Sequence, residues 1–139
     1  MRVKGDDGGT MDADSTIELS LPSDSRYMRL ARLMASGVAT TCGLPLEEVE
    51  DFRIAVDELC STLMEIGAGG QVSLRFLLED DVLVVEGRTP SAGPDRIDED
   101  RLTLSRQILD VVTDGHQLAQ VDGHTAFTAR KRLRSRGVG

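Results

Sequence analysis

A long apolar stripe at helical spacing is the feature that most constrains the fold of this chain. Apolar side chains recur at intervals of three and four residues, at Val49, Phe52, Val56, Leu59, Leu63 and Ile66. This spacing predicts an amphipathic helix with one buried face. Gly67, Gly69 and Gly70 end the pattern. The apolar face of such a helix must pack against another part of the fold, and the strands predicted after it provide that surface.

The segments around this helix alternate between strand and helix patterns. Period-two alternation predicts strands at 17–21, 72–78, 82–85 and 125–129, with a turn at 79–81 between the second and the third. The Asp122-Gly123 pair predicts a hairpin turn that joins a strand with Leu118 and Val121 to the last of them, so the expected order is β-α-α-β-β-α-β-β. A first helix is expected to bury Tyr27, Leu30, Ala31, Met34 and Val38, and a third to bury Leu104, Ile108, Leu109 and Val112. The polar stretch 89–99 reads as a loop. We therefore predict a two-layer α/β sandwich with a mixed, mostly antiparallel sheet covered on one face by three helices.

Length and composition indicate one globular domain. A chain of 139 residues can bury one sizeable core, and we expect that domain at 16–133. The Gly- and Asp-rich segment 1–15 is expected to be a disordered tail, and 134–139 a basic tail. No apolar run approaches the roughly 20 residues of a membrane-spanning helix, and the start of the chain has no signal-peptide pattern. These features predict a cytoplasmic protein without a membrane partner.

The charge of the chain narrows the class of partner. The net charge of -8 and the pI near 4.7 disfavour direct nucleic-acid binding, because such surfaces must neutralise phosphates. A protein partner with basic character fits better. Cys42 and Cys60 lie in separate helical patterns without a metal-binding spacing, and are expected to be reduced thiols.

The second helix carries the most specific string in the chain. Residues 47–62 read EEVEDFRIAVDELCST, which resembles the segment EEIEDLKIAVSEACTN of anti-sigma-factor serine kinases. Residues 17–22 and 72–76 also fit the pattern of that family, and the resemblance runs from about residue 16 to about 88. It implies the histidine-kinase-like ATPase fold of a bacterial regulator of stress-response transcription, and it implies a homodimer.

The resemblance also places a nucleotide site, but with altered residues. It assigns the general base to Glu58 and puts Thr62 where the family has a magnesium-chelating asparagine. A threonine hydroxyl is a poorer magnesium ligand than an amide oxygen. Thr89 and Ser91 fall at the Asp-x-Gly motif that recognises adenine. Thr103 and Ser105 fall in the run that replaces the Gly-x-Gly phosphate cradle.

These substitutions lead to a function and an alternative. We expect a regulatory protein that binds an alternative sigma factor, an anti-anti-sigma protein, or both, with weak or no nucleotide binding and no other cofactor. The alternative is a serine kinase that uses Mg-ATP, with Glu58 as base, to phosphorylate an anti-anti-sigma factor. A switch protein of a stress-signalling complex is a third reading.

The docking surface is predicted on the first helix. Arg26, Arg29 and Arg32 are expected to share its solvent-exposed face, and the resemblance places a partner-contacting arginine at Arg32. A cluster of three arginines on an acidic chain could pair with an acidic partner surface. An ordinary solvated helix face is the alternative reading of the same residues.

Overall fold

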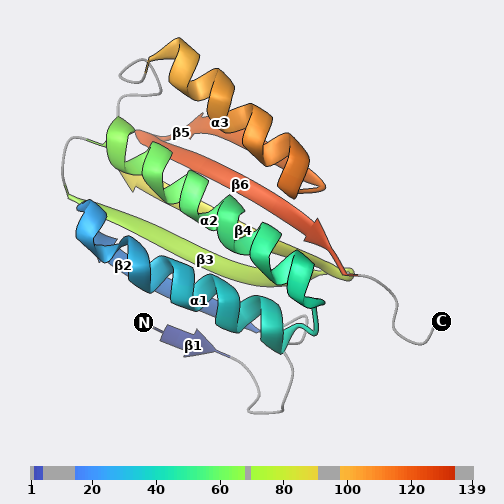
Figure 1. Cartoon of the computed structure of the whole chain (residues 1–139). Helices are drawn as coiled ribbons and strands as arrows, with labels where there is room; N and C mark the ends of the chain where they lie inside the picture. Colours follow the sequence, from blue (N-terminus) through green and yellow to red (C-terminus); the bar gives the residue numbers. More distant parts are fainter. Residues whose placement is uncertain (1, 5–14, 68–69, 91–97, 134–139) are drawn as a thin grey trace.

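The computed structural model describes residues 2–4, 15–67, 70–90 and 98–133 (Figure 1). Its elements follow one another along the chain as β1 (Arg2–Lys4), β2 (Thr16–Pro22), the short 3₁₀ helix η1 (Ser25–Tyr27), α1 (Met28–Thr41), α2 (Leu46–Ile66), β3 (Gln71–Glu79), β4 (Val82–Pro90), α3 (Glu99–Val112), β5 (Gly115–Val121) and β6 (His124–Arg132). From residue 16 onward, the predicted order of strands and helices is confirmed.

One sheet contains the six strands, in the order β1-β2-β3-β4-β6-β5. Its five strand pairs are all antiparallel, so the sheet is more uniform than the mixed one predicted. Asp122 and Gly123 both have positive φ and join β5 to β6, as the predicted hairpin requires. Asp80 and Asp81 make the corresponding turn between β3 and β4 with positive φ at both residues.

The three helices lie side by side on one face of the sheet, with α2 between α1 and α3 (Figure 1). The two-layer α/β sandwich is therefore confirmed. The core between the layers is aliphatic apart from the buried rings of Phe52, Phe76 and Phe127. Leu63 of α2 lies directly over Gly87 of β4, where an added Cβ would come within 2.6 Å of the leucine methyl. Glycine at this position therefore lets the central helix sit close to the sheet.

Two helices turn differently about their axes than predicted. Ala31 and Val38 of α1 are buried as predicted, but Leu30, expected in the core, is 43% exposed, and the helix also buries Met28, Ala35 and Ala39. Leu104, also expected in the core, is 52% exposed, and the buried face of α3 is formed by Leu102, Ser105, Leu109 and Val112. Both segments hold more apolar residues than one helix face can bury. The sequence pattern therefore allowed more than one rotation of each helix about its axis.

Two strand boundaries also differ from the prediction. Thr89 and Pro90, expected to open a loop, are the last residues of β4, where they pair with Thr125 and His124 of β6. Proline is tolerated there because it ends the strand. Residues 2–4, within the segment predicted to be a tail, pair with 16–18 of β2. The sequence does not indicate this strand, because three residues are too few to show alternation.

Candidate functional site

The site predicted from the resemblance lies between α2 and α3. Glu58 sits on the flank of α2 that faces α3, and Arg101 reaches it from the first turn of α3. The Arg101 guanidinium donates from Nη1 to Glu58 Oε1 at 2.7 Å and from Nη2 to Ser61 Oγ at 3.1 Å. Its Nε lies 3.3 Å from Glu65 Oε1. The predicted base therefore already holds a charge-assisted hydrogen bond.

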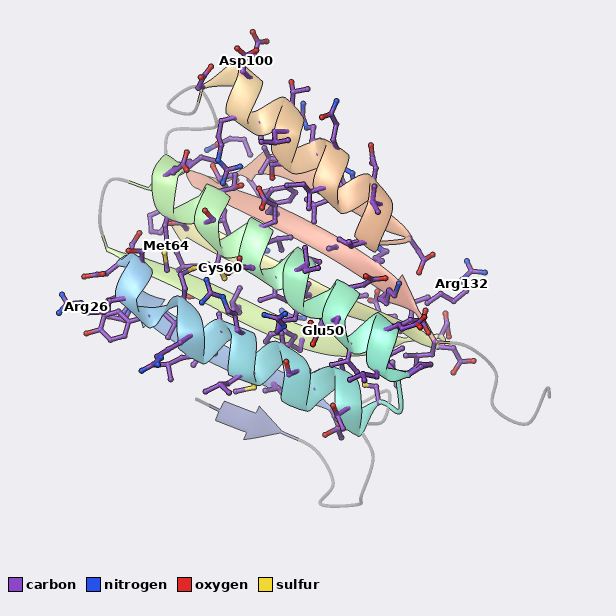
Figure 2. All side chains as sticks on the ribbon, in the orientation of Figure 1. Arg26, Glu50, Cys60, Met64, Asp100 and Arg132 are labelled. Carbon is purple, nitrogen blue, oxygen red and sulfur yellow. The ribbon has the colours of Figure 1, made fainter. Side chains whose placement is uncertain are left out.

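One helical turn further along, Thr62 meets Ser105. Both residues are fully buried, and their hydroxyl oxygens lie 3.2 Å apart. Each hydroxyl thus has a partner within the protein, which removes the cost of burying it unpaired. We call the set Glu58, Ser61, Thr62, Arg101 and Ser105 the α2–α3 seam. Figure 2 shows that side chains occupy the space between α2 and α3.

Thr89 lies at the end of β4 and is also fully buried. Its hydroxyl donates to the backbone carbonyl of Gln71 at 3.1 Å. The same hydroxyl lies against Gly67, where an added Cβ would approach it to 2.7 Å. The side chain at the predicted adenine-recognition position is therefore used to join the end of α2 to the start of β3. Ser91, the other residue of that motif, lies outside the described residues.

These contacts test whether the chain fits magnesium and a nucleotide. A metal ligand at Thr62 would have to give up its bond to Ser105, and Glu58 would have to release Arg101. Thr89 offers a neutral hydroxyl that is already committed to backbone. Within the described ranges, no group of three His, Cys, Asp or Glu residues could hold a metal ion. The described side chains therefore do not fit the group that the fold implies.

The predicted docking arginines do not form one free patch. Arg26 precedes α1, in η1, and binds Asp24 at 2.8 Å, which holds the pKa of that carboxyl below its usual range. Arg32 donates from Nε to Asp57 Oδ1 of α2 at 2.7 Å, with side chains 43% and 39% exposed. Arg29 is exposed on α1. Solvent therefore reaches all three guanidinium groups, but two of them are neutralised by carboxylates.

An apolar groove of about 580 Å³ runs along the outer side of α1. It lies between that helix and β2, and Leu30, which was predicted in the core, lines this groove instead. The side chains and backbone that line it are Ile17, Leu19, Leu30, Leu33, Met34, Gly37, Val38 and Thr41. The surface of α1 is therefore apolar along this groove and charged beside α2.

Comparisons with known proteins support the resemblance over half of the chain. The serine-protein kinase RsbW of Bacillus pumilus is 37% identical over 75 residues, which cover 50% of this chain and 46% of that protein. The enzyme of the same name from Bacillus subtilis is 37% identical over 73 residues, with the same coverage. That from Halalkalibacterium halodurans is 35% identical over 68 residues, covering 48% and 42%. Over about half of its length, the chain is therefore similar to the RsbW serine-protein kinases.

The matched region spans about half the length of these curated relatives. The sequence matches no family model. The fold is also found in a crystal structure of the RsbU and RsbW domains of Rv1364c from Mycobacterium tuberculosis. The superposed region covers 86% of this chain and 33% of the chain in that structure, with a TM-score of 0.69 and 14% sequence identity. The predicted α/β fold is therefore shared with a solved structure.

The RsbW-like site brings together some of the predicted residues and separates others. Glu58, Thr62 and Ser105 meet in the α2–α3 seam, but Thr103 lies on the exposed side of α3. Arg101, which the sequence analysis did not single out, makes polar contacts with Glu58, Ser61 and Glu65 of α2. A signal was present, since Arg101 and Ser105 are four residues apart and therefore share one face of a helix.

None of the helices in the described part of the RsbW-like chain combines the length and apolar character needed to cross a membrane.

Proposed function

We propose that this chain is an anti-sigma regulator that works by binding proteins and does not turn over nucleotide. Its partners are an alternative sigma factor, an anti-anti-sigma protein, or both, and it acts in the cytoplasm as part of a stress response. The observation that carries this proposal is the commitment of Glu58, Thr62, Thr89 and Ser105 to contacts within the chain. Ser91 and Thr103 are the other two positions at which the nucleotide motifs of the family are altered. In this proposal the fold serves as a platform for protein binding.

The docking surface in this proposal is the charged side of α1, with Arg32 at its centre and Arg29 beside it. Arg32 extends from α1 to Asp57 of α2, so a partner that contacts it would rest on both helices. Arginine is enriched among residues that dominate interface energies. The apolar groove on the outer side of α1 leaves room for the homodimer that the resemblance implies.

A capture experiment tests this proposal. Each alternative sigma factor of the source organism is co-expressed with the chain, and affinity is measured for wild type and for Arg32→Glu. We expect at least a tenfold loss, because one interfacial arginine contributes about 2 kcal/mol or more. Arg88→Glu is the matched control, since Arg88 forms a similar exposed ion pair with Glu86 on β4, away from α1. Equal affinities for wild type and Arg32→Glu would move the docking surface elsewhere.

The kinase alternative has one specific observation in its favour. The curated relatives are named serine-protein kinases, and the resemblance assigns the general base of that family to Glu58. In this reading Glu58 would have to release Arg101 and would act as the base for a serine of the anti-anti-sigma protein, and Mg-ATP would supply the phosphate. Phosphate transfer from labelled ATP to that protein, lost in Glu58→Gln, would favour the alternative over the binding role.

A further inference from the structure

The two edges of the sheet differ in length and in charge. At one edge, β1 has three residues, of which two are basic. At the other edge, β5 has seven residues, GHQLAQV, and its register with β6 is continuous from Gly115↔Arg130 to Val121↔His124. Among the strands of the described residues, only β5 contains no Asp, Glu, Lys, Arg or Pro. Proteins commonly protect an edge strand by shortness, charge or proline, so β5 is an unprotected edge.

The hairpin turn determines which backbone groups of β5 are available. Because the turn between β5 and β6 has two residues, Val121 and His124 form a hydrogen-bonded pair of the ladder. Such pairs recur at every second residue, so the N–H and C=O groups of His116 and Leu118 point away from β6. On that side, no strand of the described residues pairs with β5. A further antiparallel strand could therefore bond to these groups.

The side chains of β5 suit a second copy of the same strand. In an antiparallel pair of β5 strands that overlap along their full length, Leu118 lies opposite Leu118, and Val121 lies opposite Gly115 of the other copy. Val121 is 41% exposed, and the position where Gly115 would carry a Cβ is open space. The valine side chain can therefore cover the glycine backbone across the strand pair.

The charges of α3 are complementary to themselves in the same arrangement. His116 Nε2 lies 2.6 Å from Asp110 Oδ1, which places Asp110 on the β5 side of α3. Arg106 lies one turn earlier and therefore on the same side. Arg106 has no ion-pair partner among the described residues, and the Asp110 side chain is 71% exposed. A two-fold axis between the strands makes the two α3 helices antiparallel, so that Arg106 of each copy can pair with Asp110 of the other.

We propose that β5 is a self-association edge, through which two copies of this chain pair antiparallel and continue one sheet across a two-fold axis. Backbone hydrogen bonds of His116 and Leu118 join the strands, and Arg106 and Asp110 of α3 favour the antiparallel direction. α3 covers this end of the sheet, whereas α1 covers the other end (Figure 1). The contact therefore leaves the groove and the charged side of α1 free, and it does not depend on the proposed function.

Cross-strand charges test this pairing, because Gln117 lies opposite Ala119 of the other copy in the full overlap. Gln117→Lys/Ala119→Lys places lysines opposite lysines, whereas Gln117→Glu/Ala119→Lys places each lysine opposite a glutamate. Gln71→Lys/Ser73→Lys is the control, with the same added charge and spacing on the inner strand β3. In sedimentation experiments up to about 100 µM protein, the double lysine variant should dissociate with a constant about tenfold or more above that of wild type. The glutamate–lysine variant and the control should stay within about threefold of wild type.

Amide hydrogen exchange shows whether the strands themselves pair. In self-associated wild type, the amide protons of His116 and Leu118 should exchange about tenfold or more slowly than in the double lysine variant, because only a paired strand protects them. A monomeric wild type would overturn the proposal in favour of a strand from another protein. Equal weakening by the double lysine and glutamate–lysine variants would overturn it as well. So would self-association without slow exchange at His116 and Leu118, which would assign the contact to another surface.

Discussion

Helix α2 is packed by different chemistry on its two flanks. The α1 side of the domain is built from small apolar residues, and Ala31, Ala35, Ala39 and Ala55 are all fully buried. The Arg32–Asp57 ion pair lies at the surface above them. Toward α3, the contacts are charged and hydroxylic, and Thr62 and Ser105 lie fully inside. The first flank can pack closely without polar partners, whereas the second remains stable only if every buried polar group is paired.

This difference separates a flank that holds the fold from a flank that could hold a ligand. A polar side chain that is paired within the protein can exchange its partner for a polar group of a ligand. Apolar side chains packed in a core have no such specific partner to exchange. The α2–α3 seam keeps the polar character of a binding site and satisfies it internally. Substitutions can measure how much of the stability of α3 comes from the polar contacts of the seam and how much from apolar packing.

The largest expected effect comes from apolar packing even on the polar flank. Leu109 of α3 is fully buried, so Leu109→Ala should lower the free energy of unfolding by roughly 2–5 kcal/mol, the range for cavity-forming substitutions. Urea denaturation of the two proteins measures this. A loss well below that range would mean that α3 depends mainly on the polar contacts of the seam.

The two interhelical ion pairs provide a direct comparison of the flanks. The side chains of Arg101 and Glu58 are 25% and 15% exposed, whereas those of Arg32 and Asp57 are 43% and 39% exposed. Arg101→Ala should cost about 1–3 kcal/mol, since it leaves a mostly buried carboxylate without its donor. Arg32→Ala should cost less than about 1 kcal/mol, as exposed pairs do. Equal losses in urea denaturation would remove the distinction between the flanks.

The Thr62–Ser105 contact can be measured with a double-mutant cycle. Thr62→Val keeps the shape of the side chain but leaves the Ser105 hydroxyl unpaired, at a cost of about 1–3 kcal/mol. Adding Ser105→Ala removes that unpaired group and should recover part of the loss. If the two effects simply add, the hydroxyls do not depend on each other and the seam contains one contact instead of two.

The smallest effect at neutral pH is expected from the cysteines. Burial raises the pKa of the Cys42 thiol to about 11 and, with the nearby Asp57 carboxylate, that of Cys60 to about 12. In the unfolded chain both thiols ionise near pH 8.5, so the folded state binds more protons above that pH and stability must fall as pH rises. No change is expected at pH 7. Urea titrations at pH 8 and 10 should show a smaller decline in Cys60→Ala than in wild type.

The position of α2 shows how far sequence patterns reach. Its stripe from Val49 to Ile66 has one apolar face and admits one phase, so both the helix and its buried residues were predicted correctly. The turns at 79–81 and 122–123 were also predicted correctly. Local backbone conformation decides such turns, so neighbouring residues are enough to indicate them. The resemblance carried by residues 47–62 then placed Glu58 and Thr62 on a helix flank beside the core.

From residue 16 onward, the sequence by itself determined the order of the elements, and it determined the resemblance to the RsbW kinases, because these depend on local periodicity and on one continuous string. Only the tertiary structure decided what Glu58, Thr62 and Ser105 contact. α3 has apolar residues on two faces, and the predicted buried face included Leu104 but not Leu102. Packing against Ile66 and the sheet selected Leu102 instead, and the same rotation turned Ser105 inward and brought Arg101 to Glu58. Which face of a helix is buried depends on the surface that it covers, and for α3 that surface is formed by residues distant in the sequence.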